Sequence, residues 1–275
     1  MPELPEVETV CTAIRPYVVG RQVRTVSTYT RALRHPLNEI RLQQHIEGQT
    51  VRALRRRGKF LVFELSNQRA VVCHLGMTGA FKVCDTATPR LPHEHVVWQL
   101  DNHSTLRFED ARRFGMMLPA TLSAPGTDPD MLNKLGPEPL GTEFTPAYVS
   151  RSMETSIAPV KNLLLNQTLV AGIGNIYANE ALFMARVSPR RKGKNLGNRR
   201  CIRIVRSIRT VLTDAITCGG TTIRDFRTPD GAEGHFRTCL NVYGKNGQPC
   251  PECGNCIRRI VQAGRSTFYC PTCQR

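Results

Sequence analysis

The pattern of apolar positions near the start of the chain predicts an amphipathic helix. Four apolar residues follow one another at spacings of three and four, which is the repeat of one helix face: Val7, Val10, Ile14 and Val18. Proline is favoured in the first helical turn and glycine just after the last, so Pro5 and Gly20 predict a helix over residues 5–19. The buried face of this helix would hold the residues before it in a fixed position.

Short runs in the following part of the chain alternate apolar and polar side chains, which is the period of a half-buried strand. Gly, Asn, Asp and Pro lie between the runs. The predicted strands cover residues 22–29, 51–57, 59–65, 70–75, 79–84, 95–100, 104–109 and 114–118. Many short strands in about 100 residues predict a β-sandwich or barrel-like domain.

The composition changes after the last predicted strand. Residues 119–150 are rich in proline and glycine, and we interpret them as the connection between two domains. Helical periodicity then predicts helices over residues 145–153, 158–166, 175–185 and 195–217. The chain is therefore expected to have an α+β fold with two domains.

Two glycine-containing stretches lie among these helices. In Gly172-Ile173-Gly174-Asn175 the glycines permit a close backbone approach to a phosphate, and Asn175 is well placed to cap the following helix. A simple helix–helix turn has the same composition, so both interpretations stay open. Residues 219–236 are too polar and Gly-rich for a packed element, and we interpret them as a mobile functional loop.

The charge of the chain points to its class of partner. It has 38 Lys+Arg against 22 Asp+Glu, so the formal net charge is +16, and the pI is about 9.8. Such a balance indicates a polyanionic partner, usually nucleic acid. No apolar run approaches the ~18 residues of a membrane span, and the N-terminus lacks a secretion signal. We therefore expect a soluble intracellular protein, whose eleven cysteines serve as free thiols and metal ligands.

The last 35 residues contain two C-x2-C pairs with sixteen residues between them. Four thiolates at this spacing fit one tetrahedral, structural Zn²⁺ on a β-hairpin: Cys250, Cys253, Cys270 and Cys273. Cys256 offers a competing pair with Cys253, but that choice shortens the spacer below the usual range. Arg258, Arg259 and Arg265 make the segment basic, which favours phosphate contact, although a zinc ribbon can also bind protein.

The first eight residues, Met-Pro-Glu-Leu-Pro-Glu-Val-Glu, contain a candidate catalytic group. Removal of Met1 would leave Pro2 with a secondary amine whose pKa lies near 8. Such an amine can attack an electrophilic sugar carbon and form an iminium. Glu3 and Glu6 could donate a proton and fix the geometry. Acidic residues also simply suit a helix start, so this stretch alone leaves both interpretations open.

A dense basic stretch lies in the strand-rich part of the chain: Arg52, Arg55, Arg56, Arg57 and Lys59. A solvated strand face is one explanation. Phosphates would also offset the repulsion among these cations, and we expect the Lys59 ammonium to project toward the start of the first helix.

These motifs together resemble the formamidopyrimidine-DNA glycosylase family, whose bacterial enzymes remove oxidised purines from DNA. The resemblance covers the whole chain. It rests on the N-terminal stretch, Lys59 and the four-cysteine finger, with four further segments between Lys59 and the finger. These segments are 74–77 (HLGM), 112–115 (RRFG), 135–140 (LGPEPL) and 172–177 (GIGNIY). The related endonuclease VIII branch, which prefers oxidised pyrimidines, usually has Gly at the position of Leu4 and lacks the RRFG segment. The purine-directed branch is therefore the closer match.

The resemblance implies an N-terminal β-sandwich flanked by helices, followed by a helix-two-turn-helix and a zinc-finger β-hairpin. We place the N-terminal catalytic domain at residues 1–134, the linker at 135–150, the helical domain with a lesion-recognition loop at 151–240 and the finger at 241–275. The implied partner is double-stranded DNA that contains oxidised purines or abasic sites. A monomer in the bacterial cytoplasm, associated with the nucleoid and with no membrane contact, is expected.

The resemblance also implies roles for individual residues. Pro2 would attack C1′ of the damaged nucleotide, and β- and δ-elimination would follow. Glu3 would act as general acid, with Lys59 and Arg265 taking part in elimination. The remaining implied roles are support of the site by Glu6 and Lys161, and DNA contact by His93, Arg112, Asn175 and Arg265.

A base must leave the duplex before such an enzyme can act on it. By resemblance, Met77, Arg112 and Phe114 form the wedge that fills the void, and residues 221–236 form the loop that closes on the flipped base. Four departures from the family pattern stand out: Ala111 for Pro, Thr78 for Ser or Glu, Asn166 for Asp, and the additional Cys256. Because none of them touches Pro2, Glu3 or Lys59, we expect an active enzyme.

Three alternatives remain at this stage. The chain could be a DNA-binding protein without catalytic activity, a sibling enzyme that acts on oxidised pyrimidines, or a zinc-ribbon adaptor that binds proteins. Retention of Pro2 and Glu3 disfavours the first. An adaptor would show no salt-sensitive DNA binding, whereas phosphate contacts predict an affinity that falls steeply with salt.

Overall fold

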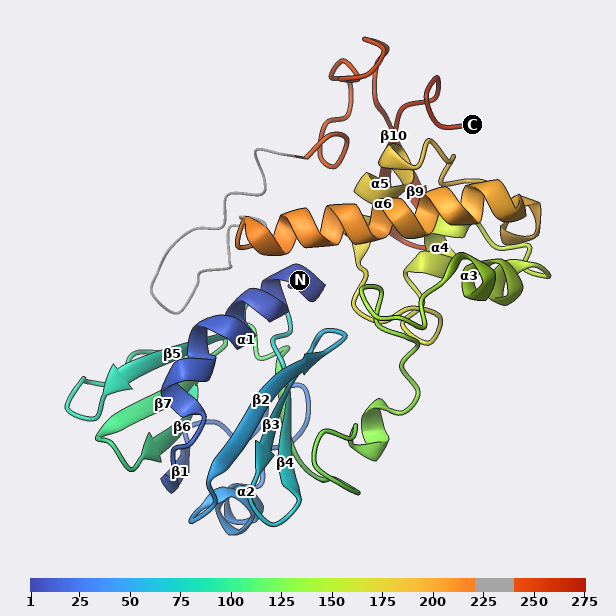
Figure 1. The fold of residues 1–275 in the computed structure, drawn as a ribbon. Coiled ribbons are helices and arrows are strands. Elements are labelled where there is room, and N and C mark those ends of the chain that lie inside the picture. Colours follow the sequence, from blue (N-terminus) through green and yellow to red (C-terminus); the bar gives the residue numbers. More distant parts are fainter. Residues whose placement is uncertain (221–239) are drawn as a thin grey trace. The chain divides into compact units, whose positions relative to one another are not determined.

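A computed structural model describes residues 1–220 and 240–275 (Figure 1). The chain forms two compact units. The described part of the first comprises Met1–Asn133 with Gly219 and Gly220, and that of the second comprises 134–218 and 240–275. The predicted lesion-recognition loop, residues 221–236, lies outside the described residues, and the division into four segments stays a prediction.

The first unit begins with α1, Leu4–Val18, close to the predicted range. The stripe of Val7, Val10, Ile14 and Val18 is buried as the periodicity requires. The helix contacts β2 and β3 of one sheet and β5 of the other. Because this stripe belongs to the main core, the residues at the N-terminus of α1 are held by the whole unit.

Each of the eight predicted runs overlaps a strand of the first unit, with bounds that differ by up to three residues. The strands are β1 Val23–Thr28, β2 Val51–Arg57, β3 Phe60–Leu65, β4 Arg69–His74, β5 Ala80–Asp85, β6 Glu94–Leu100, β7 Ser104–Glu109 and β8 Met116–Thr121. They form two antiparallel four-stranded sheets, in the orders β1-β6-β7-β5 and β2-β3-β4-β8.

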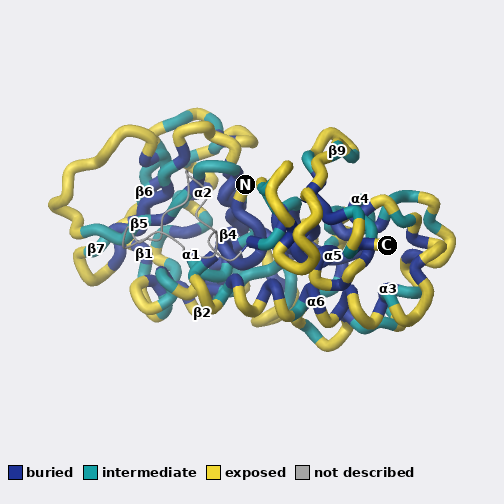
Figure 2. The backbone as a smooth tube through the Cα atoms, turned by 90° about the horizontal axis from the view of Figure 1, so that it is seen from above, coloured by how far each residue is buried: buried dark blue, intermediate teal, exposed yellow. Residues whose placement is uncertain are grey.

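Aromatic side chains join the two sheets. The ring of Phe63 on β3 lies 5.1 Å from that of Trp98 on β6 and 5.6 Å from that of Phe81 on β5, measured between centroids. Phe81 in turn contacts Phe108 on β7. All four residues are almost fully buried, and Figure 2 shows the buried interior of these strands. The predicted sandwich is therefore confirmed.

One helix of this unit was missed by the sequence analysis. Helix α2, Glu39–Ile46, begins after Asn38, whose side chain accepts a hydrogen bond from the N–H of Arg41. Only Leu42 and Ile46 of the helix are buried. Two apolar positions four residues apart are too few to give a periodic signal.

The described part of the second unit contains four α-helices: α3 Pro146–Met153, α4 Val160–Leu164, α5 Asn175–Met184 and α6 Gly197–Thr217. Helix α6, the long orange helix of Figure 1, packs against α3 and α5. Short 3₁₀ helices occur at Asp130–Leu132 in the first unit and at Gly193–Asn195 in the second. Among the described residues, no helix is long and apolar enough to cross a membrane.

The chain ends with the predicted hairpin, formed by β9 Arg258–Gln262 and β10 Arg265–Tyr269. Its turn places Ala263 and Gly264 at φ of 47° and 71°. The backbone N–H of Phe268 donates to Oδ1 of Asn179 at 2.8 Å, which ties β10 to helix α5. The hairpin is thus fixed to the helical part of the second unit.

Candidate active site and metal centre

Pro2 and Glu3 are buried at the start of α1, whereas Met1 is 40% exposed. Glu3 is the N-cap residue of the helix. Its backbone N–H donates to Oε2 of Glu6 at 2.8 Å, and its carboxylate accepts from the Glu6 backbone in return. This reciprocal capping box fixes both carboxylates within one helical turn of Pro2.

Lys59 lies at the turn between β2 and β3 and is only 6% exposed. The preceding Gly58 has a φ of 57°, a left-handed conformation that glycine adopts without strain. His74, at the end of β4, is close to this lysine. Burial lowers the pKa of His74 to about 3, and the charges of Arg34, Lys59 and the N-terminal amine add to the effect. Lys59 and the terminal amine are therefore both near His74.

The sequence analysis gave His74 no role of its own. Its Nδ1 accepts a hydrogen bond of 2.9 Å from the N–H of Gly76. Because the ring is neutral, the proton must reside on Nε2. The imidazole thus holds the first residues of the turn that carries Met77. The membership of His74 in the HLGM motif could have indicated that it has a role in the site.

The two predicted wedge segments are locked to each other. Gly76 has a φ of 66°, and a Cβ there would lie 2.4 Å from the carbonyl carbon of Phe114. The hydroxyl of Thr78 donates to Oδ1 of Asp110 at 2.5 Å and accepts from the N–H of Arg112 at 3.2 Å. The other Asp110 oxygen accepts from the N–H of Gly115 at 2.6 Å.

The tips of these segments remain accessible. Phe114 is 45% exposed, and Cζ of Arg112 lies 4.8 Å from the centroid of its ring. Met77 is half-buried. Ala111, where the family usually has Pro, is exposed, and the loop is held by Asp110 and Thr78 on either side of it. The sequence analysis missed both of these supporting residues.

His93 is exposed and has a φ of 69°. Its carbonyl accepts from the N–H of Asp110 at 3.0 Å, and its ring lies 6.1 Å from that of His95. The candidate DNA-contacting histidine is therefore connected to the residue that organises the wedge.

Carboxylates within the protein offset the charge of three arginines of the basic stretch, which neither of the two interpretations had included. Nε of Arg55 lies 2.6 Å from Glu64, and Nη1 lies 2.7 Å from Asp128. Asp128 also pairs with Arg57 at 2.6 Å, and Glu8 pairs with Arg56 at 2.7 Å. Carboxylates distant in the sequence, which spacing along the chain could not identify, neutralise this strand.

In the second unit, Lys161 and Asn175 meet at one backbone carbonyl of the hairpin. Nζ of the fully buried Lys161 donates to the carbonyl of Ser266 at 3.0 Å and to Oγ1 of Thr267 at 2.6 Å. Nδ2 of Asn175 donates to the same Ser266 carbonyl at 3.0 Å. Arg265, one residue away, is exposed at the start of β10.

The predicted capping role of Asn175 is wrong. The N-cap of α5 is Gly174, and Asn175 is the first helical residue, with its amide directed to the hairpin. The Oδ1 atom of Asn175 is buried and has no hydrogen-bond partner in the described part of the chain. It lies at a helix N-terminus, where backbone N–H groups favour anions.

Asn166, where the family usually has Asp, has a local role. Its Oδ1 accepts from the backbone N–H of Thr168 at 3.0 Å and from the Thr168 hydroxyl at 2.9 Å. An Asp carboxylate would make the same turn, so the substitution preserves the local structure.

The four predicted zinc ligands converge. The sulfur atoms of Cys250, Cys253, Cys270 and Cys273 all lie within 4.8 Å of one another. The separation is 3.5 Å between Cys253 and Cys270 and 3.9 Å between Cys250 and Cys273. Tetrahedral Zn²⁺ with Zn–S bonds of ~2.3 Å requires sulfur atoms about 3.8 Å apart, so the donor set fits this metal. Cys256 is exposed and not a member of the cluster. The ten cysteines in the described ranges form no disulfide, as expected.

Comparison with family models gives three matches along the chain. They are the formamidopyrimidine-DNA glycosylase N-terminal domain over residues 1–117, the H2TH domain of the same enzyme over 135–227, and the zinc finger found in FPG and IleRS over 247–275. The third match agrees with the cysteine cluster, and the chain has one structural zinc site.

Known proteins match over the full length. The chain is 42% identical to the formamidopyrimidine-DNA glycosylase of Marinobacter nauticus over 275 residues, all of both chains. It is similar to the crystal structure of MutM (Fpg) from Thermus thermophilus, with 42% identity, a TM-score of 0.86 and coverage of 99% and 98%. A Lactococcus lactis Fpg complex with DNA containing N7-benzyl-Fapy-dG matches with 33% identity, a TM-score of 0.88 and full coverage of both chains. The chain therefore belongs to the formamidopyrimidine-DNA glycosylase family.

Proposed function

We propose that the protein is a bifunctional DNA glycosylase and AP lyase that excises oxidised purines from duplex DNA in base excision repair. Family membership and full-length similarity to named glycosylases support the class of enzyme. The observation that carries the chemistry is the buried pair Pro2 and Glu3, fixed at the start of α1 by the capping box.

The proposed reaction begins once Met1 has been removed. The Pro2 nitrogen attacks C1′ of the damaged nucleotide, the bond from C1′ to the base breaks, and the base leaves with a proton. Opening of the sugar ring, with Glu3 as proton donor to the ring oxygen, gives an iminium at C1′. The iminium acidifies the C2′ hydrogen, so the 3′ phosphate and then the 5′ phosphate leave by elimination.

Lys59 and His74 suit the environment that this reaction needs. A neutral His74 places no additional charge beside Lys59 and the start of the chain, where removal of Met1 would leave the Pro2 amine. Neighbouring cations favour the unprotonated, nucleophilic form of an amine. Lys59 would also contact the phosphate that leaves, as the resemblance implies.

The wedge would supply access to the lesion. Phe114 is exposed, and Arg112 lies over its ring, so the pair presents an apolar face with a hydrogen-bonding edge. Such a group can enter the base stack while Arg112 bonds the orphaned cytosine. Met77 would fill the remaining void.

The second unit would hold the phosphates that flank the lesion. Asn175 is the first residue of a helix, where backbone N–H groups favour anions, and the exposed Arg265 starts a strand whose next residue, Ser266, is bonded by Asn175. Lys161 would support this group by holding the Ser266 carbonyl. Zinc would stabilise the hairpin that presents Arg265, because such a hairpin is too small to fold alone.

The double-stranded substrate is inferred from the neighbours. The Lactococcus lactis Fpg forms a complex with DNA that contains N7-benzyl-Fapy-dG. We propose the same class of substrate, DNA with a damaged purine, for the present chain, because it retains the segments with Met77, Arg112 and Phe114. Action as a monomer in the bacterial cytoplasm, with DNA of the nucleoid as substrate, completes the proposal.

Borohydride trapping on an 8-oxoguanine:cytosine duplex, followed by mass mapping, tests the chemistry. We expect one covalent adduct, mapped to the N-terminal Pro2. A Gly in its place would still carry a reactive terminal amine, so the informative variant is Pro2→Leu, whose large side chain prevents removal of Met1 and which should give no adduct at position 2. Pro5→Ala is the control, because it removes a proline at the start of α1 and leaves the Pro2 amine in place. An adduct on Lys59, or none despite intact DNA binding, would contradict the proposal. Preferential trapping on a thymine-glycol duplex would instead assign the chain to the pyrimidine class.

A further inference from the structure

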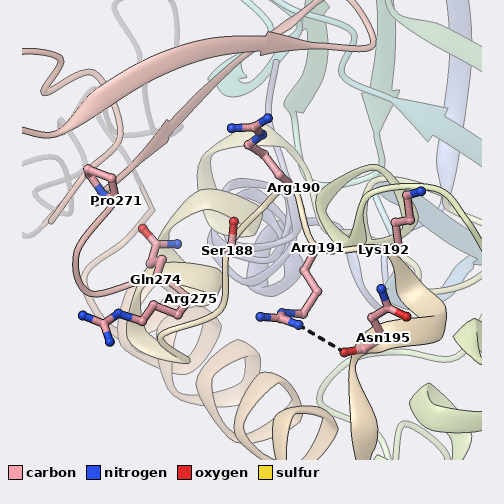
Figure 3. A pocket seen from close by; sticks show the side chains of 8 residues that line it. All are labelled: Ser188, Arg190, Arg191, Lys192, Asn195, Pro271, Gln274 and Arg275. Carbon is pink, nitrogen blue, oxygen red and sulfur yellow. Dashed lines mark hydrogen bonds between the residues drawn. The ribbon is translucent and has the colours of Figure 1, made fainter.

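The second unit has a strongly basic pocket that the proposed reaction does not use. Its volume is about 600 Å³. We call it the basic pocket; it is lined by Ser188, Arg190, Arg191, Lys192, Asn195, Pro271, Gln274 and Arg275. Figure 3 shows Gln274 and Arg275 from the C-terminal segment on one side, and Arg191, Lys192 and Asn195 on the other.

The four cations of the pocket have no acidic side chain as partner within the described ranges; a carboxylate beside them is that of the terminal residue Arg275, whose oxygen accepts from the N–H of Ser188 at 3.4 Å. No Asp or Glu lines the pocket, and none of the ion pairs of the described chain involves these side chains. Arg55 and Arg57, by contrast, both pair with the carboxylate of Asp128. An anion from outside the chain would supply the missing negative charge.

Arg191 has unused hydrogen-bonding capacity at this position. Its Nε atom is buried and lacks a partner in the described structure, and so does Nε of the nearby Arg200. The hydrogen bond from Nη1 of Arg191 to the carbonyl of Asn195 is long, at 3.4 Å. Burial and the charge of Arg200 both lower the pKa of Arg191. A bound anion would accept hydrogen bonds from the Arg191 guanidinium and would offset its positive charge.

Hydrogen bonds between distant segments build the frame of the pocket. The buried side chain of Gln274 donates to the carbonyl of Val187 at 3.0 Å and accepts from the N–H of Cys270 at 2.9 Å. The carbonyl of Arg191 accepts from the N–H of Val160 at 2.7 Å. These bonds fix the backbone on both sides, so a ligand would meet a pre-organised site.

The basic pocket is separate from the phosphate-binding group proposed above. Arg265 begins β10, and the pocket residue Pro271 follows the end of that strand at Tyr269. Four strand residues alone span roughly 13 Å, at ~3.3 Å for each. One phosphate group cannot reach both places.

We propose that the basic pocket binds a phosphate group with two or more negative charges, carried by the end of a nucleic acid strand or by a nucleotide. Guanidinium forks match the oxygens of phosphate, and the Ser188 hydroxyl and the Asn195 amide add neutral donors. This site does not depend on the chemistry at Pro2.

Calorimetric titration of the zinc-loaded, full-length protein with inorganic pyrophosphate tests the site. We expect saturable binding that Arg190→Glu with Lys192→Glu weakens at least ten-fold. Both residues are exposed, so the fold should tolerate the change. Arg151→Glu with Arg206→Glu makes the same charge change at exposed residues outside the pocket and should retain binding within two-fold. No saturable binding, or equal weakening in both variants, would overturn the proposal.

Competition identifies the source of the phosphate. A short oligonucleotide with a 5′-phosphate that displaces pyrophosphate, when its 5′-hydroxyl counterpart does not, indicates a strand end. Displacement by ATP and not by adenosine, without an effect of either oligonucleotide, indicates a nucleotide. Failure of all these competitors would refute a site for phosphorylated ligands. Trapping on Pro2, measured in the same variants, reports separately on the proposed reaction.

Discussion

The hydroxyl of Thr78 donates to the carboxylate of Asp110 at 2.5 Å, which joins the segment of Met77 to that of Arg112 and Phe114. Asp110 is fully buried, and its second oxygen is bound by the N–H of Gly115. Two loops that are more than thirty residues apart in the sequence thus depend on one carboxylate. The geometry of the wedge depends on this bond.

Removal of the Thr78 hydroxyl should loosen the wedge. A hydrogen bond to a charged acceptor contributes roughly 1.5–3 kcal/mol, so we expect Thr78→Ala to slow excision of 8-oxoguanine about ten-fold or more. Thr25→Ala, which removes an exposed hydroxyl bonded to Gln99, is the control. Single-turnover excision measures the effect. Equal rates in the two variants would mean that the Thr78–Asp110 bond does not support the wedge.

Truncation of Phe114 should affect extrusion of the base more than later steps. We expect Phe114→Ala to reduce 8-oxoguanine excision about ten-fold more than cleavage at a pre-formed abasic site, because the latter has less stacking to disrupt. Tyr29→Ala is a matched control, since Tyr29 is 51% exposed and also has an arginine, Arg90, over its ring. Equal losses on both substrates would rule out a wedge role for Phe114.

Loss of zinc should release the hairpin. Cys270→Ser removes one of four ligands, and we expect metal content to fall and DNA affinity to drop at least ten-fold, because Ser266 and Arg265 belong to the hairpin. Cys256→Ser should retain both, as Cys256 lies outside the cluster. Metal analysis and a binding titration test this pair. If Cys270→Ser lost its zinc but kept full affinity for DNA, the proposal that zinc holds the hairpin for DNA binding would be wrong.

His74 should make stability dependent on pH. Its pKa is about 3 in the folded protein and near 6.5 when unfolded, so the unfolded state binds more protons between these values. Stability is unaffected by this group above pH 6.5 and falls below it, by about 2 kcal/mol at pH 5.

Denaturant unfolding at pH 7 and pH 5 measures this dependence. His74→Asn keeps an acceptor for the N–H of Gly76 and should reduce the loss between the two pH values. His103→Asn, at an exposed position, should lose as much stability as the unmodified protein. An unchanged loss in His74→Asn would disprove this role of the imidazole.

The sequence predicted those features that depend on a periodic pattern or on the spacing of metal ligands. The stripe on α1 was predicted because the helix buries one face, and the strands because short apolar runs lie between turn residues, even where both faces are buried, as in β3 and β4. The four cysteines were predicted because zinc geometry constrains their spacing. Contacts between distant segments left no such pattern. Asp128 and Glu64, which neutralise Arg55, and the carbonyl of Ser266, which receives Lys161 and Asn175, could be identified only from the fold.

The placement of Pro2 and Glu3 at the start of α1 determines how these residues can unfold. The stripe of this helix belongs to the central core of its unit, and terminal fraying would have to break the capping box and expose Leu4 and Val7. Amide exchange at Glu6 and Val7 should therefore proceed through global unfolding of this unit. The chain terminus, normally the least ordered part of a protein, here shares the lifetime of the folded core.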